Sequence, residues 1–270
     1  MALPDALAPL ILDHRDPAGV AVLTLNNPAR RNSLSEAMMD ALSQHLSRIA
    51  GDRSVRAVIL AANGPAFSAG HDLKELNARR SDPDRGRAYF ADIMGRCSQL
   101  MQSIVRLPQP VIAQVEGVAT AAGCQLVATC DLAIAATTAR FATPGVNIGL
   151  FCSTPMVALS RNMSAKHAME MLLTGDMIDA EEARRIGLVN RVVASSELAD
   201  KTLALGRQIA GKSTLTVKIG KEAFYRQREM TLSEAYDHAA AVMVENMLAR
   251  DAEEGIGAFI EKRPPHWEDR

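Results

Sequence analysis

Neither sign of charge dominates this sequence. Its 270 residues carry 30 Lys and Arg against 31 Asp and Glu, a formal net charge of −1. Broad electrostatic binding of nucleic acid needs a basic surface, so this balance argues against a nucleic-acid partner. The basic doublets are scattered along the chain, which predicts solvated surface positions for Arg30-Arg31, Arg79-Arg80 and Arg184-Arg185.

Cysteine patterns typical of metal sites and long hydrophobic runs are also missing. The four cysteines are Cys97, Cys124, Cys130 and Cys152. No pair has a short metal-ligand spacing and three lie in apolar stretches, so we expect free, reduced thiols and no metal site. No apolar run has membrane-spanning length, and the amino-terminal stretch MALPDALAPLILDHRD lacks the basic region of a signal peptide. We therefore expect a cytoplasmic protein without a membrane partner.

The sequence does contain alternating strand-like and helix-like segments. Hydrophobic residues make up 48% and charged residues 23%, an ordinary globular composition in a chain long enough to bury a full core. Strands are predicted at 20–25, 55–62, 110–117, 132–136 and 188–193. A first helix is predicted from a Ser33–Glu36 capping box to a stop at Gly51. Further helices are predicted at 87–106, 122–130, 155–161, 164–173, 179–186, 196–211, 213–228 and 231–262.

This alternation favours an α/β core followed by a helix-rich last third. The last third lacks the strands to form a sheet of its own, so it must pack on the core or on another subunit. A polar, charge-rich segment at about 72–86 is predicted to form a surface loop or short helix.

Two glycine-containing turns follow buried strands, FSAGHDLKEL at 67–76 and EGVATAAGC at 116–124. Each places small residues where a strand gives way to a helix. Such a junction leaves backbone N–H groups unpaired at the positive end of the helix dipole. Two of these turns side by side would offer convergent donors to an oxyanion, whereas either turn alone is also explained by tight helix–strand packing.

Four stretches in this order resemble the enoyl-CoA hydratase/isomerase, or crotonase, family. They are AFSAGHDLKEL, PVIAQVEGVATAAGCQL, CDLAIA and LTGDMIDAEEARRIGLVNRVV, and the resemblance extends from about residue 10 to 265. Within the family, EGVATAAGCQLVATCDLAIA and FATPGVNIGLFCSTP are most similar to the subgroup of enoyl-CoA hydratase domain-containing proteins.

The resemblance implies an α/β fold of the crotonase type, a spiral of repeated β-β-α units with a C-terminal helical trimerisation region. The spiral core would span residues 1–200, and the helical region, 201–270, would pack on the core and on a neighbouring subunit. The implied partners are an acyl-CoA ligand and further copies of the chain, as a homotrimer or a dimer of trimers. The CoA thioester would be the substrate, with no separate cofactor.

The resemblance also assigns site residues. The oxyanion donors would be the backbone N–H groups of His71 and Ala122, and the alanines at 121 and 122 replace the family's usual glycines. The turn at 29–31 and the loop at 71–74 would line the CoA channel, with Arg30, Arg31, His71, Asp72, Leu73 and Lys74 beside the ligand. Arg30, Arg31 or Lys74 would pair with the CoA phosphates, and Phe259 and Lys262 would reach the CoA of a neighbouring subunit.

Both acid–base residues of the family's hydratases are missing. In those hydratases two glutamates share the work, and here their positions hold Gln125 and Gly145. An amide does not titrate near neutral pH, and a glycine has no side chain to move a proton. We therefore expect an acyl-CoA enzyme with an oxyanion hole but without efficient hydration, or alternatively a non-catalytic acyl-CoA-binding or scaffolding homologue in fatty acid metabolism.

No nearby residue is a strong replacement for these glutamates. Cys152 is a possible nucleophile, but no histidine is near it in the sequence, which favours a buried inert thiol. Ser153 and Thr154 are placed to cap the helix that starts near Pro155. Glu116 fits a structural role better than a catalytic one, and Asp72 and Glu75 are expected at solvated surface positions. A role in RNA binding would need a lysine-rich helix, and the sequence has none.

Overall fold

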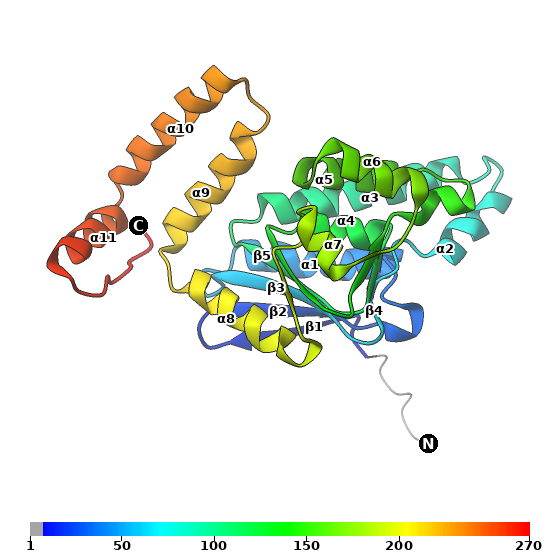
Figure 1. Cartoon of the computed structure of the whole chain (residues 1–270), viewed down its shortest axis with the longest axis horizontal. Helices are drawn as coiled ribbons and strands as arrows, with labels where there is room; N and C mark the ends of the chain where they lie inside the picture. Colours follow the sequence, from blue (N-terminus) through cyan, green and yellow to red (C-terminus); the bar gives the residue numbers. More distant parts are fainter. Residues whose placement is uncertain (1–7) are drawn as a thin grey trace.

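Two sheets of mostly parallel strands form the centre of the molecule (Figure 1). The computed structural model describes residues 8–270, so Pro4 and Asp5 of the amino-terminal stretch lie outside the described part. The larger sheet contains β1 (Ile11–Asp16), β2 (Val20–Leu25), β3 (Ala57–Ala62), β5 (Val111–Val115), β7 (Leu132–Ala136) and β10 (Arg191–Val193), in this order. The smaller sheet contains β4 (Ala66–Ser68), β6 (Val118–Thr120), β8 (Arg140–Ala142) and β9 (Ile178–Asp179). β1 and β9 run antiparallel to their neighbours β2 and β8.

Successive strand pairs divide between the two sheets. In β3–β4, β5–β6 and β7–β8 the first strand joins the larger sheet and the second joins the smaller one. The turn between β5 and β6 is tight, because Gly117 has a φ of +70° and a Cβ there would lie 2.1 Å from the carbonyl oxygen of Pro65. With the helices that follow, these pairs form the repeated β-β-α units of the expected spiral, so the predicted α/β fold class is confirmed.

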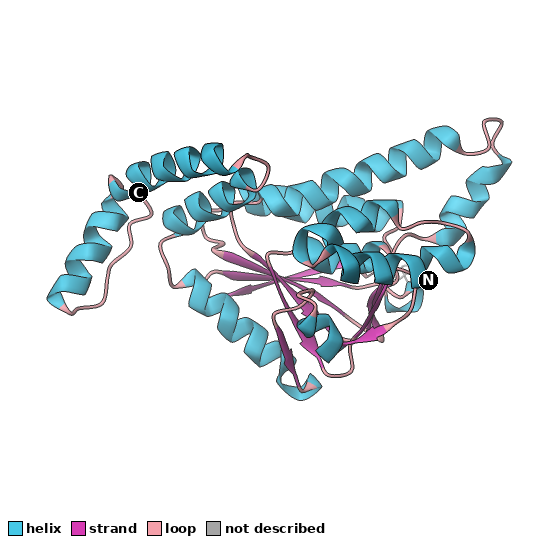
Figure 2. Ribbon diagram, turned by 45° about the horizontal axis from the view of Figure 1, so that its top comes forward, coloured by secondary structure: helices cyan, strands magenta, loops and turns pink. Residues whose placement is uncertain are grey.

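Helices cover both faces of the larger sheet (Figure 2), and its central strands β3, β5 and β7 are mostly buried, as expected for parallel strands. Leu23 and Leu60 pack with α1 (Glu36–Ala50), α3 (Arg87–Arg106) and α4 (Ala122–Thr129) on one side. Ile59 and Ile112 pack with α8 (Leu198–Ala210) on the other side. The remaining helices of the core are α2 (Leu73–Ala78), α5 (Ser153–Asn162), α6 (Ala165–Thr174) and α7 (Ala180–Arg185).

The last three helices form a carboxyl-terminal arm that extends away from the sheets (Figure 1). The arm consists of α9 (Thr214–Gln227), α10 (Leu232–Met247) and α11 (Arg250–Glu261). Lys221 of α9 is buried and anchors the arm, because its ammonium group donates to Asp131 Oδ2 at 2.7 Å and to two backbone carbonyls. At the end of the chain, the indole N–H of Trp267 donates to the carbonyl of Gly211 at 3.0 Å. α10 buries none of its residues.

Several local expectations were wrong. The first helix is capped by Ser35, whose side chain accepts the N–H of Met38, while the hydroxyl of Ser33 donates to Asp72. Neither Ser153 nor Thr154 caps α5, because the helix already begins at Ser153. The segment 231–262 is helical as predicted, and it is divided into two helices because Ala249 is extended with a ψ of 145°.

The predicted division of the chain near residue 200 falls inside α8, which packs on the larger sheet.

Within residues 8–270, no helix combines the length and apolar character needed to span a membrane.

Candidate active site

The first glycine-containing turn connects β4 to α2. Gly70 has a φ of +84°, and its N–H donates to the hydroxyl of Ser68 at 3.3 Å. The Gly70 carbonyl accepts the N–H of Leu34 at 2.8 Å, and the next residue, His71, forms a parallel bridge with Leu34. These contacts hold the turn against the start of α1.

The second turn connects β6 to α4. The N–H of Ala121 donates to the carbonyl of Ala142 at 3.0 Å, so the turn is tied to β8. Ala121 has φ 50° and ψ −121°, a backbone conformation that is strained for a residue with a Cβ. The helix begins immediately afterwards at Ala122.

The structure brings these two turns into contact. A Cβ on Gly70 would lie 3.0 Å from the nitrogen of Ala122, and a Cβ on Gly123 would lie 2.1 Å from the carbonyl oxygen of Ser68. Glycine is therefore needed on both sides of the contact. The N–H groups of His71 and Ala122 donate no hydrogen bond to any acceptor in residues 8–270. Two unpaired backbone donors thus occupy adjacent turns, and one of them belongs to the first residue of a helix.

The imidazole of His71 has a defined arrangement of its two ring nitrogens. Nδ1 lies 3.3 Å from the carbonyl oxygen of Leu34, and a carbonyl only accepts, so Nδ1 carries the hydrogen. Nε2 is then the acceptor, and it is buried without a partner in the described part of the chain. Burial lowers the pKa of the imidazole, which the hydrogen bond to Leu34 offsets only in part.

Gln125 follows Ala122 by one turn of α4 and is 4% exposed. Its Oε1 is buried and accepts no hydrogen bond from residues 8–270. The side chain lines a cavity of about 800 Å³ bounded by α3, α4, α5 and α9. An unpaired buried acceptor costs free energy unless a ligand or water donates to it, so Gln125 gives this cavity an open hydrogen-bonding position.

Gly145 is the buried residue of a 3-10 turn at Pro144–Ile148 and has little free space around it. A Cβ at this position would lie 2.9 Å from the Sγ of Cys152 and 2.9 Å from the carbonyl oxygen of Leu150. The position of the second lost glutamate is therefore filled by the loop that leads into α5. Cys152 supplies packing there, and burial raises the pKa of its thiol, which makes the reactive thiolate scarce at neutral pH.

The structure also brings together the two segments expected to contact CoA. The N–H of Ala69 donates to the carbonyl of Arg31 at 3.0 Å, and the guanidinium of Arg30 lies 3.2 Å from Asp72. Asp72 is buried and caps α2 by accepting the N–H of Lys74 at 2.9 Å, so the expectation of a solvated surface position was wrong. Arg30, Arg31, Leu73 and Lys74 are exposed beside it.

Phe259 and Lys262 are not brought to these turns within one chain. Both lie at the end of α11, at the outer part of the arm (Figure 1). Phe259 is 85% exposed, and Lys262 ends the helix with a φ of 57°.

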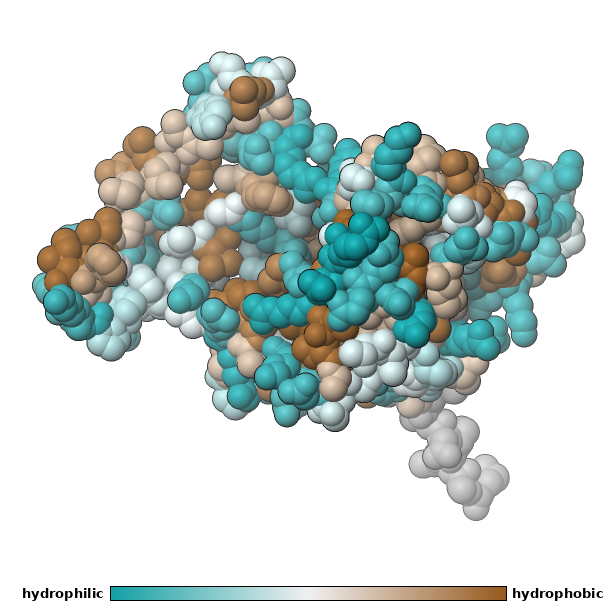
Figure 3. Space-filling view, viewed as in Figure 1, coloured by the Kyte–Doolittle hydropathy of each residue, from teal (hydrophilic) through white to brown (hydrophobic). Residues whose placement is uncertain are grey.

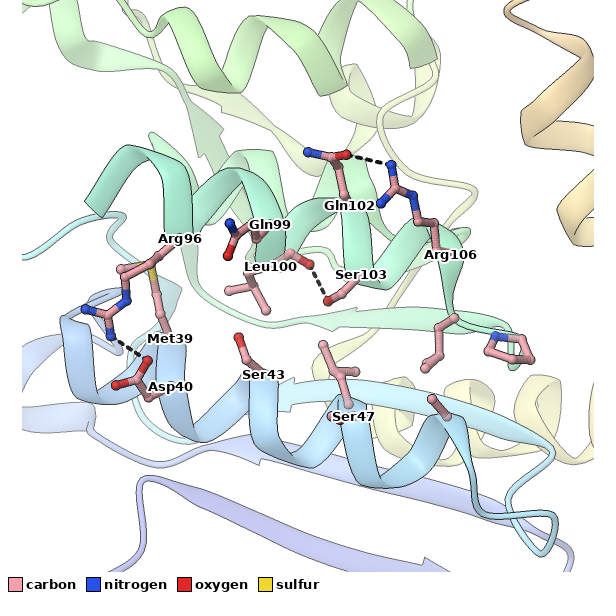
Figure 4. A pocket seen from close by; sticks show the side chains of 14 residues that line it. Met39, Asp40, Ser43, Ser47, Arg96, Gln99, Leu100, Gln102, Ser103 and Arg106 are labelled. Carbon is pink, nitrogen blue, oxygen red and sulfur yellow. Dashed lines mark hydrogen bonds and ion pairs between the residues drawn. The ribbon is translucent and has the colours of Figure 1, made fainter. Parts of the chain in front are cut away.

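A second hollow of about 560 Å³ lies between α1 and α3 (Figure 4), and Gln102 and Arg106 of α3 line both hollows. Three of its polar side chains already have hydrogen-bond partners. Arg96 binds Asp40, Gln102 accepts from Arg106 at 2.8 Å, and the hydroxyl of Ser103 donates to the Leu100 carbonyl at 2.7 Å.

Sequence reasoning missed the residues that α3, α5 and α9 contribute to the cavity beside Gln125. Among them are Arg106, Arg161, Arg226 and Arg228. Isolated arginines on predicted helices look like ordinary surface positions, and a single sequence carries no signal that the helices converge.

Known proteins are similar to this chain in sequence. The sequence profile described as "Enoyl-CoA hydratase/isomerase" matches residues 15–270. Enoyl-CoA hydratase domain-containing protein 3, mitochondrial, from Homo sapiens is 47% identical over 249 residues, which are 92% of this chain and 80% of the relative. The rat protein of the same name is 45% identical over 96% of this chain and 85% of its own length.

Solved structures of similar proteins superpose closely. An enoyl-CoA hydratase from Mycobacterium smegmatis has a TM-score of 0.91 and 53% identity, covering 96% of this chain and 99% of that one. Human enoyl-CoA hydratase domain-containing protein 3 has a TM-score of 0.90 and 45% identity, covering 96% of this chain and 100% of the other. The likeness predicted from the sequence motifs is thus confirmed at the level of sequence and fold.

Proposed function

Because the chain belongs to the enoyl-CoA hydratase/isomerase family, we propose that it binds an acyl-CoA thioester and polarises the thioester carbonyl with the N–H groups of His71 and Ala122. The observation that carries this proposal is the pair of unpaired donors on two touching turns. Donors fixed in this way favour the negative charge that develops on the carbonyl oxygen, and one such donor is worth about 3–4 kcal/mol in the transition state. The positive end of α4 adds to the effect at Ala122.

Proton transfer is the weak part of this site. Gln125 can orient a water or a polar group but cannot take its proton, and Gly145 has no side chain. A positioned general acid or base contributes about 10²–10⁴-fold to a rate. Water addition to an enoyl thioester therefore proceeds slowly at best, and reactions with different proton demands fit better.

Decarboxylation and thioester hydrolysis are two such reactions. In a decarboxylation the bond to the departing CO₂ breaks, its electron pair forms an enolate held by His71 and Ala122, and solvent returns a proton to carbon. In a hydrolysis water attacks the carbonyl carbon of the thioester. The thiolate of CoA then leaves, and the proton lost by the water goes to solvent. Both use the donor pair without a carboxylate base at position 125 or 145.

The CoA part is proposed to lie over the turn at 29–31 and the start of α2. Arg30, Arg31 and Lys74 are exposed there and provide positive charge for the phosphates. Asp72 lies 3.2 Å from the guanidinium of Arg30 and orients it. The positive charges of Arg31 and Lys74 remain available to the phosphates.

The arm is proposed to build a homotrimer or a dimer of trimers, with Phe259 and Lys262 contacting CoA on a neighbouring subunit. Hydrophobic side chains gather at the outer end of the arm (Figure 3). Leu248 is 77% exposed and Ile260 is 72% exposed, in addition to Phe259. An arm with such a surface needs a partner.

A cytoplasmic location remains a prediction from the sequence alone; the names of the human and rat relatives contain the word "mitochondrial".

The test is to incubate the purified protein with saturated, unsaturated and carboxylated acyl-CoAs and to follow each by mass spectrometry, with binding measured in parallel by calorimetry. Turnover of one thioester supports an enzyme. Binding of thioesters without turnover supports the second candidate, a non-catalytic acyl-CoA-binding or scaffolding protein in fatty acid metabolism, which the absence of acid–base groups at 125 and 145 favours. Absence of binding to every thioester would contradict both.

A further inference from the structure

The cavity beside Gln125 has a polar inner end. Gln125 is 4% exposed, and the Oε1 atom of its side-chain amide has no hydrogen-bond partner among residues 8–270. The residue lies one helical turn from the Ala122 donor, so the cavity starts next to the proposed position of the thioester. A saturated alkyl chain laid against this amide would leave it unpaired, whereas a polar acyl group would satisfy it.

The outer, more exposed lining of the cavity is rich in arginine. Arg106 comes from α3, Arg161 from α5, and Arg226 and Arg228 from α9. Arg161 lies 3.5 Å from Glu229, and Arg228 donates to the carbonyl of Arg161 while its guanidinium lies over the ring of Phe224.

Two of these arginines have no carboxylate partner. Arg106 donates only to the neutral amide of Gln102, at 2.8 Å, as Figure 4 shows from the other side of α3. Arg226 forms no ion pair with any carboxylate in residues 8–270. The acidic residues that also line the cavity are Glu222 and Glu229, so positive charge remains in excess.

We propose that this cavity receives an acyl group that ends in a carboxylate, held by Arg106 and Arg226 at its outer end and by Gln125 near the thioester. The proposal rests on the proposed function, since the thioester has to be bound at His71 and Ala122. Met101, Val105 and Ala158, which are apolar, line the cavity together with these polar groups and suit the methylene groups of such a chain. Arginine is well matched to a carboxylate because its planar guanidinium can donate two parallel hydrogen bonds.

The test compares thioesters of equal chain length with and without the terminal carboxylate. Glutaryl-CoA and adipoyl-CoA are titrated against valeryl-CoA and hexanoyl-CoA by calorimetry at low and high salt. We expect the dicarboxylic thioesters to bind about tenfold more tightly at low salt, because each exposed pairing contributes about threefold. The preference should shrink at high salt, where exposed charges are screened.

Three variants and a control locate the effect. Arg106→Gln and Arg226→Gln should each reduce the preference for the dicarboxylic thioester by about threefold. Glu222→Gln removes a competing negative charge and should increase the preference. Arg80→Gln is the control, because Arg80 is exposed beside Phe90 and does not line the cavity.

Equal binding of both classes, or a preference that both arginine variants leave intact, would overturn this proposal while the acyl-CoA site stands. Failure of all four thioesters to bind would instead contradict the proposed function itself, and the proposal with it.

Discussion

Ala121 is the residue whose backbone conflicts most directly with its side chain. Its φ of 50° with ψ of −121° is a region that glycine occupies readily, and such strain costs about 1–3 kcal/mol. We expect Ala121→Gly to raise the free energy of unfolding by about 1 kcal/mol, because relief of strain exceeds the added flexibility of the unfolded chain. Urea-induced unfolding measures the change.

The adjacent Ala122 offers a matched control. It is the first residue of α4 and has no positive φ, so Ala122→Gly should lower stability by up to about 1 kcal/mol. If both glycine variants shift the urea midpoint in the same direction, strain at Ala121 is not the cause.

His71 gives the site a pH dependence. Burial lowers the pKa of its imidazole from 6.5, so below pH 6.5 the unfolded chain binds a proton that the folded protein resists. Stability contributed by the neutral imidazole is therefore present above pH 6.5 and decreases on acidification, by up to about 1.4 kcal/mol per pH unit.

We expect wild-type stability to fall more steeply below pH 6.5 than that of His71→Asn, whose side chain does not titrate. NMR titration of the ring should show the Nδ1–H tautomer. A His71 resonance that titrates above 6.5 would contradict this assignment.

The two lost glutamate positions differ in how they can be tested. Gln125→Glu replaces an amide with a carboxylate of the same shape and should raise the rate of crotonyl-CoA hydration by about 10²-fold. Gln125→Ala, which supplies no base, is the control and should show no gain.

Gly145→Glu should instead lower stability by about 1–3 kcal/mol or more, because its Cβ would collide with Leu150 and Cys152. Equal stability of Gly145→Glu and wild type in thermal unfolding would contradict this prediction, because it would show that the loop containing Leu150 and Cys152 can move to accommodate the side chain.

At the scale of elements, sequence patterns predicted the long strands and the amphipathic helices and missed the smaller sheet. β4, β6 and β8 are three residues each, and β9 is shorter still. Such strands are too short for a periodic pattern, and they exist because neighbouring units of the spiral place them side by side. β1 was missed because its central residues are exposed and polar.

The site shows the same division between local and distant information. The glycine-containing turns at 67–76 and 116–124 are local motifs and could be found in the sequence. Other features depend on packing between segments that are distant in the sequence, and a single sequence gives no pattern from which to predict them. They are the contact between Gly70 and Ala122, the filled space around Gly145 and the arginines beside Gln125.

Lys221 is the main polar link between α9 and the core. Its ammonium group pairs with Asp131, which also accepts the hydroxyl of Tyr225 at 2.8 Å and the N–H of Val111 at 2.7 Å. We expect Lys221→Met to lower the free energy of unfolding by about 3 kcal/mol, because Asp131 loses its charged partner in a mostly buried position.

The double variant Lys221→Met, Asp131→Asn should cost less than the sum of the single changes, as measured by denaturant unfolding. Strict additivity would mean that the ion pair does not couple α9 to the core.

At the scale of the whole molecule, the arm exposes more hydrophobic surface than a single chain needs. Phe259 and Ile260 are 85% and 72% exposed. We expect Phe259→Ser with Ile260→Ser to shift a trimer toward monomers in sedimentation equilibrium, because the change removes apolar area from the proposed subunit contact.

Leu73→Ser is the matched control, since Leu73 is 53% exposed on the core and not on the arm. A wild-type chain that sediments as a monomer, or an arm variant that keeps the trimer intact, would contradict the proposed assembly.

The position of Trp267 has a practical consequence. It is the chain's single tryptophan, its indole is fastened to Gly211 where the arm joins the core, and Gly255 of α11 lies against its ring. Intrinsic fluorescence excited at the indole band therefore reports on this junction alone, while circular dichroism reports on the entire fold. Recording both signals during one melting experiment would reveal whether the arm detaches before the sheets unravel.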